Sequence, residues 1–190
     1  MKTPTITLRD VKHCDGELQI DKHYRATIKI EHDDFGETPW EAGDGNGIVA
    51  EWTRRDKHPG ELVLCEDRGS KRYFDFAGTV KLARRDGWDA EPYGTGTVGE
   101  RAHRAAMADF ERMHAWCNNE WHWIGVAVTV SHKGAEISAD SLWGIESDGD
   151  YWQDVAREMI EGAIAAHKSE VKERKFWNAR DVVTVALCAS

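Results

Sequence analysis

The chain has 190 residues, is 41% hydrophobic with nine tryptophans, and carries a formal net charge of −9. This composition supports a hydrophobic core and excludes wholesale disorder, and the surplus acid argues against direct nucleic-acid binding, which needs clustered Lys and Arg. No apolar run approaches the ~20 residues of a membrane span, so we expect a soluble single domain over residues 1–190.

The first third of the chain has the character of short β-strands. His23–Glu31 alternates apolar and polar side chains, which is the period of a half-buried strand. Ile6–Val11, Ile48–Thr53 and Leu62–Glu66 are further candidate strands, with Asp15–Gly16 as a hairpin-like connection. Together they predict a small antiparallel meander.

Two helices are expected in the middle of the chain. Asp75–Arg85 has an apolar face, and Gly87 is placed to end it. Thr97 and Glu100 match a capping box, in which each side chain satisfies an otherwise unpaired backbone amide. That box opens a helix that runs to about Cys117 and ends at Asn118.

The last third predicts a hairpin followed by a helix. Trp121–Ser131 carries apolar or small side chains on both faces, as a covered central strand does, and Glu136–Leu142 is its expected partner. A helix follows within Leu142–His167. The charged run after His167 is compatible with more helix, and Asp181–Leu187 with a last strand or a buried tail. The fold class is therefore α+β, an antiparallel sheet packed with about three helices.

This last helix has two contrasting faces. At 100° per residue, one face is apolar and wide enough to pack on a sheet; it carries Trp152, Val155, Ala156, Met159, Ala163 and His167. The opposite face carries Asp150, Asp154, Glu158 and Glu161. Like charges at this spacing cost about 0.2–0.5 kcal/mol per pair, and the helix dipole offsets that cost only in the first turn.

The acidic face belongs to a wider segregation of charge. Residues 31–52 contain seven acids and no Lys or Arg, and residues 136–161 contain eight acids against Arg157 alone. The further candidate site residues in these stretches are Glu146, Asp148, Asp33, Asp34, Glu37, Glu41 and Asp44. One interpretation is a set of solvated faces; the other is a surface complementary to a basic partner.

The most metal-like cluster is His114, Cys117 and His122. Zinc sites usually have four N or S ligands, and no fourth ligand is evident here. Cys117 also lies on the expected apolar face, which favours a buried thiol over a ligand or a nucleophile. The four cysteines form no CxxC pair and no signal peptide is visible, so we expect free thiols in the cytoplasm and no cofactor.

Three stretches, Arg72–Trp88, Trp116–Val130 and Ser141–Ile164, together resemble a family of hypothetical proteins encoded by tailed phages and prophages. They cover roughly half of the chain. This resemblance implies a setting in which small acidic proteins inhibit host defence, among them antirestriction and anti-CRISPR proteins. Some of these inhibitors space carboxylates as DNA spaces phosphates.

The sequence hypothesis is a non-enzymatic, phage-encoded inhibitor in the cytoplasm of the infected bacterial host, with an anti-CRISPR protein as the favoured class. It would occupy a basic nucleic-acid-binding surface on a CRISPR complex subunit through its acidic faces. The alternatives are a small metal- or thiol-dependent enzyme of phage nucleic-acid metabolism using Cys117, His114 and His122, and a structural or replication-associated phage protein.

Overall fold

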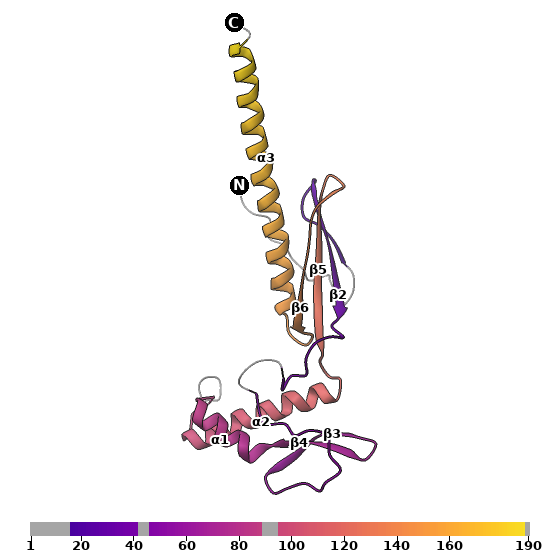
Figure 1. The fold of residues 1–190 in the computed structure, drawn as a ribbon, viewed down its shortest axis with the longest axis vertical. Coiled ribbons are helices and arrows are strands. Elements are labelled where there is room, and N and C mark those ends of the chain that lie inside the picture. The colour runs from indigo at the N-terminus through magenta and orange to yellow at the C-terminus, as the bar shows by residue number, and fades with distance from the viewer. Residues whose placement is uncertain (1–15, 42–45, 89–94, 189–190) are drawn as a thin grey trace. The chain divides into compact units, whose positions relative to one another are not determined.

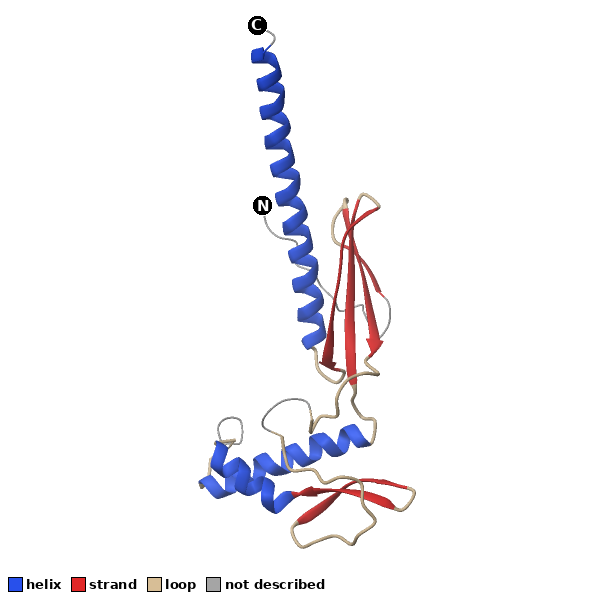
Figure 2. Ribbon diagram, in the orientation of Figure 1, coloured by secondary structure: helices blue, strands red, loops and turns tan. Residues whose placement is uncertain are grey.

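A computed structural model describes residues 16–41, 46–88 and 95–188, with the side chains of 179–188 excluded. The chain divides into two compact units. Unit 1 combines Met1–Asp34 with Trp123–Ser190, and unit 2 is Phe35–His122, so unit 2 is an insertion within unit 1. The α+β class is confirmed (Figure 2). Cooperative folding of 1–190 as one domain stays a prediction.

Unit 1 is built on an antiparallel sheet in the order β1-β2-β5-β6. Its strands are β1 (Gly16–Gln19), β2 (Tyr24–His32), β5 (Trp123–His132) and β6 (Ala135–Glu146). The predicted strand at 23–31 and the predicted central hairpin are both confirmed. Strand β2 pairs with β5 far along the sequence, with Ile28 opposite Val128.

Helix α3 (Tyr151–Cys188) covers one face of this sheet (Figure 1). The core is formed by two sets of side chains. One set is every second residue of the strands, as a strand's two-residue period requires, and the other comes from the predicted apolar face of the helix. They include Ala26, Ile28, Val126, Val128 and Val130 from the strands and Trp152, Val155 and Ala156 from the predicted face, with Ile160 of α3 beside them. The apolar face of the sequence analysis is therefore a packing face.

A side chain from β6 covers part of β5. The Trp143 ring lies directly over Gly125, because a Cβ built on Gly125 would come within 2.3 Å of that ring. Trp143 sits where the pairing of β5 and β6 shifts register between Ile124 and Val126. An extra residue at such a bulge redirects a side chain, which here places an aromatic ring over a strand position that has no side chain of its own.

Unit 2 consists of a hairpin and two helices. The hairpin is β3 (Glu61–Asp67) and β4 (Ser70–Asp75), and the helices are α1 (Phe76–Asp86) and α2 (Val98–Cys117). Its buried cluster includes Leu64, Phe74 and Met113, with Phe110 and Trp40 packed around it.

The helix ends follow the sequence signals. The Asp75 carboxylate accepts from the Gly78 N–H at 2.8 Å, and Gly87 adopts a left-handed φ of 73° at the C-terminus of α1. Thr97 and Glu100 form the complete predicted capping box of α2. Asn118 caps the other end, so both predicted boundaries of this helix are confirmed.

Three strand predictions have other outcomes. Ile6–Val11 lies outside the described residues, and Ile48–Thr53 contributes only the isolated bridges of Val49 with Phe74 and of Thr53 with Lys71. Gly16 begins β1 instead of serving a connection. Asp181–Leu187 is helical, because α3 continues through it. The predicted meander therefore differs in its pairing: β3 joins β4 in a separate two-stranded sheet.

Candidate functional site

We use the term acidic face for Asp150, Asp154, Glu158 and Glu161. All four residues are exposed, and the residues of α3 between them that turn the other way, such as Val155 and Ala156, are buried against the sheet. The sheet therefore fixes the rotation of α3 and directs the acidic face to solvent. Asp154 pairs with Arg157 one turn along, and its side chain remains 62% exposed.

The helix dipole favours only the start of this face. Asp150 immediately precedes the first residue of α3, and its carbonyl accepts from the Gln153 N–H at 2.9 Å. Negative charge there faces the positive end of the helix. Glu158 and Glu161 lie beyond that first turn. They add to a negative potential without local compensation from the dipole, and this is the electrostatic condition for attracting a cationic partner.

Four other predicted residues belong to the same unit. Glu146 ends β6 and Asp148 lies in the turn before α3, and both are exposed. The Asp33 N–H donates to the Trp123 carbonyl at 2.9 Å, and the Asp34 carboxylate lies 2.9 Å from His32 Nδ1. Asp33 and Asp34 thus mark the point where the chain leaves unit 1.

The remaining acidic candidates do not belong to the described part of unit 1. Glu37 and Glu41 are exposed residues of unit 2. Asp44 lies outside the described residues. The acidic stretch that is continuous in the sequence is therefore shared between two units, and α3 with the turn before it is the acidic surface whose geometry is defined.

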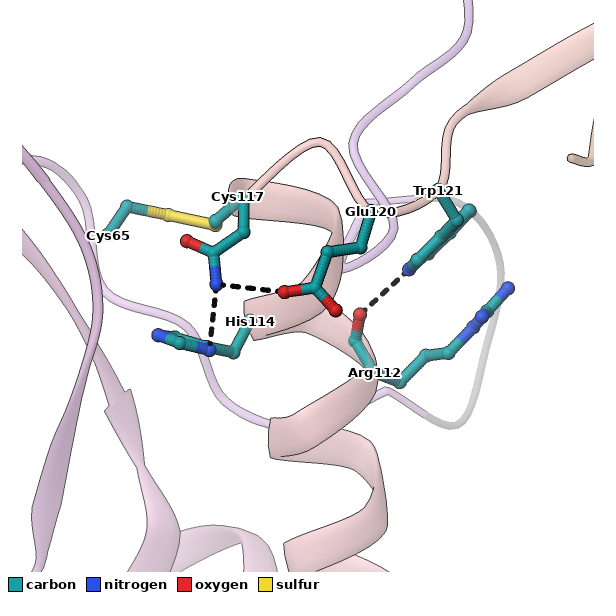
Figure 3. The surroundings of a disulfide bond; sticks show 7 residues. Cys65, Arg112, His114, Cys117, Glu120 and Trp121 are labelled. Carbon is teal, nitrogen blue, oxygen red and sulfur yellow. Dashed lines mark hydrogen bonds between the residues drawn. A yellow bond between two sulfur atoms is a disulfide. The ribbon is translucent and has the colours of Figure 1, made fainter. Parts of the chain in front are cut away.

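Cys117 is not a free thiol. Its sulfur is bonded to Cys65, joining the end of α2 to β3 with a Cα–Cα distance of 6.0 Å (Figure 3). The sequence prediction of free thiols is wrong for this pair. A disulfide sulfur is neither a thiolate nucleophile nor a thiolate metal ligand, so the enzyme alternative loses the residue on which it depended.

His114 also has a structural role. Its ring stacks on Phe110 with centroids 5.5 Å apart, and its Nδ1 lies 3.2 Å from the Asn118 amide nitrogen at the helix end (Figure 3). Among the side chains of residues 16–41, 46–88 and 95–178, no group of three or more His, Cys, Asp or Glu is arranged to hold a metal ion. His114, Cys117 and His122, the most metal-like residues in the sequence, form no such group.

A half-buried carboxylate in unit 2 had no signal in the sequence. Asp109 Oδ2 accepts from the Gly47 N–H at 2.7 Å, and the next amide, of Ile48, donates to Thr79 Oγ1 at 3.0 Å. Helices α1 and α2 thereby fix the chain after the glycine-rich segment. Burial raises the pKa of Asp109 to about 6, and the Gly47 hydrogen bond opposes that rise.

A histidine cluster in unit 1 also had no signal in the sequence. The Tyr24 hydroxyl lies 2.9 Å from His167 Nδ1, and the rings of His132 and His167 have centroids 4.6 Å apart. Burial, followed by the charges of His167 and Lys133, lowers the pKa of His132. Tyr24 is far from both histidines in the sequence, and only the β2–β5 pairing and the docking of α3 bring the three rings together.

Comparison with known proteins adds no relative to this description: no family model, curated protein or solved structure matches the chain. Over the described part of the chain, no helix has the length and apolar composition needed to cross a membrane.

Proposed function

We propose that the protein is a non-enzymatic inhibitor of a host defence system, encoded by a phage, that binds a basic nucleic-acid-binding surface of its target. A CRISPR complex subunit is the target class we favour. The observation that carries the proposal is the acidic face of α3, which is exposed while the opposite side of the same helix is buried in the core of unit 1.

The dimensions of this face support imitation of a nucleic acid. From Asp150 to Glu161 a helix rises about 16 Å at 1.5 Å per residue. One strand of duplex DNA places a phosphate about every 3.4 Å along its axis, so four carboxylates cover about the length of five phosphate steps. A channel whose Lys and Arg side chains bind the DNA backbone would find negative charge over a similar length on the acidic face.

Rigidity is the second support. The acidic face lies on a helix whose rotation is set by buried Trp152, Val155 and Ile160, so the backbone positions that carry its carboxylates are fixed before binding. Ordered groups lose less conformational entropy on association than flexible ones. Complementary charge also speeds encounter and makes association sensitive to salt.

The test is charge reversal on the acidic face. A variant with Asp150, Asp154, Glu158 and Glu161 all changed to Lys is mixed with purified defence effectors, and its binding and its blockade of target DNA binding are measured at low and high salt. We expect loss of both, and wild-type binding that weakens as salt is added. The matched comparison is between Asp154→Lys with Glu158→Lys and Glu170→Lys with Glu173→Lys, because both pairs add the same positive charge and the second pair adds it to other sides of α3.

Full inhibition by the folded quadruple variant would contradict the proposal. Circular dichroism and the thermal midpoint establish whether the variant is folded. A pull-down from host lysate, with and without a defence complex, identifies the effector for the quantitative assay.

A further inference from the structure

The outward side of α3 changes its sign of charge halfway along the helix. At 100° per residue, Lys168, Lys172 and Lys175 fall on the same side of the helix as the acidic face. On this side, residues 150–161 carry the four acids and Arg157, and residues 168–175 carry three lysines. We use the term basic face for these three lysines. A helix surface with this arrangement has charge complementary to the same surface on a second helix that runs antiparallel to it.

The C-terminal part of α3 projects past the end of the sheet (Figure 1). The contacts with β2 near this point come from His167, which meets the Tyr24 hydroxyl, and from Lys168, whose Nζ lies 5.6 Å from the Tyr24 ring. Residues 169–178 are exposed except for half-buried Val171. Phe176 and Trp177 are 57% and 56% exposed.

Such a projecting helix is expected to need a partner. Isolated helical segments are marginal in water unless tertiary packing stabilises them, and exposed large apolar side chains mark interaction surfaces. A second copy of the chain supplies both kinds of group that the projecting half requires, opposite charge and an ordered helical surface.

We propose that two copies pair through antiparallel α3 helices, with the two-fold axis passing between Ile164 and Ala165. Around this axis, Glu161 lies opposite Lys168 of the second copy and Asp154 lies opposite its Lys175. Glu158 lies opposite Val171 and next to Lys172. Arg157, which pairs with Asp154 of its own helix, lies opposite Lys172. Because the interface is isologous, every pairing occurs twice, and the overlap from Asp154 to Lys175 is about 32 Å long.

A small side chain near the axis allows the helices to approach. Ala165 lies next to the axis on the outward side of α3 and is exposed. Close helix contacts elsewhere use small residues in this way.

The pairing does not depend on the proposed function, but it uses the same carboxylates. In the dimer each acidic face is covered by a basic face, so a basic target would have to displace the second copy. The protein would then be a dimer at rest and a monomer on its target, and its apparent affinity for the target would fall as its own concentration rises.

The test is a charge swap read as molar mass in solution. One double variant, Asp154→Lys with Glu158→Lys, makes most of the outward side basic; the other, Lys172→Glu with Lys175→Glu, makes it acidic. Sedimentation velocity over a wide concentration series should give a dimer for the wild type. Each variant alone should dimerise at least about tenfold more weakly, and an equimolar mixture of the two should recover the dimer.

Two further variants complete the test. Ala165→Trp places a large ring beside the axis and should also yield a monomer, whereas Glu170→Lys with Glu173→Lys, which lie on other sides of α3, should leave the dimer intact. A wild type that stays monomeric throughout the series, or a mixture that fails to recover the dimer, would overturn the pairing. Molar mass is measured without a target, so failure here is distinct from failure of target binding.

Discussion

Replacing Asp109 by Asn should stabilise the protein at neutral pH. The amide oxygen of the new side chain would still accept from the Gly47 N–H, which Asp109 accepts at 2.7 Å, and the substitution removes a charge that burial disfavours. Desolvation raises the pKa of Asp109 from 3.8 to about 6. At about 1.36 kcal/mol per pKa unit this is about 3 kcal/mol, which we reduce to about 1–2 kcal/mol because the group is partly exposed to solvent.

The sign of the pH dependence follows from this raised pKa. Between about pH 4 and pH 6 the folded protein binds a proton at Asp109 that the unfolded chain has released. The contribution of Asp109 protonation to the stability of the folded state is therefore complete below about pH 4 and is lost as pH rises through about 6. The free energy of unfolding of the Asp109→Asn variant should equal that of the wild type near pH 4 and should be larger than that of the wild type at pH 8.

The assay is urea unfolding followed by far-UV circular dichroism at several pH values, analysed as the difference between variant and wild type. The difference is needed because Glu61, whose pKa the Arg55 side chain lowers from 4.5 to about 2, loses its contribution as pH falls through that range. A difference that does not change with pH, or a variant less stable than wild type at pH 8, would refute the reasoning. Asp109→Ala is the control: it leaves the Gly47 amide without its acceptor and should cost about 1–3 kcal/mol.

Two other predictions concern unit 2. Alkylation of the unfolded chain should label Cys65 and Cys117 only after reduction, and Cys65→Ser should cost about 2–4 kcal/mol in urea unfolding because the bond closes a long loop; labelling of both residues without reduction would show that the pair is reduced. Thr97→Ala should cost about 1 kcal/mol through loss of the capping box, whereas Thr97→Ser should restore most of it, and equal unfolding midpoints for the two variants would exclude a capping role.

Local patterns in the sequence predicted most of the elements. Alternation identified β2 and the central hairpin, and the Thr97–Glu100 capping box and Gly87 marked helix ends where the structure has them. The apolar side of α3 was also predictable, because its residues repeat with the helical period. These features depend on neighbours within a few positions, and such information is present in the sequence.

Features that depend on distant partners were not predictable in this way. The bond between Cys65 and Cys117 joins residues 52 positions apart that share no motif. Asp109 looks like an ordinary helix-surface acid until α2 packs beside the Gly47 segment. The acidic residues of the candidate site were recognised by composition, but their division between two units depends on where β2 ends and β5 begins.

The insertion of unit 2 between β2 and β5 has a consequence for biosynthesis. Strand β2 leaves the ribosome long before its partner, so the sheet of unit 1 cannot close until Trp123–His132 has been made, while the inserted unit is complete earlier. Asp33 and Trp123, which flank the insertion, are hydrogen-bonded in the finished protein. An insertion that folded first with its ends close together would shorten the effective loop between β2 and β5, and so would lower the entropy cost of their pairing.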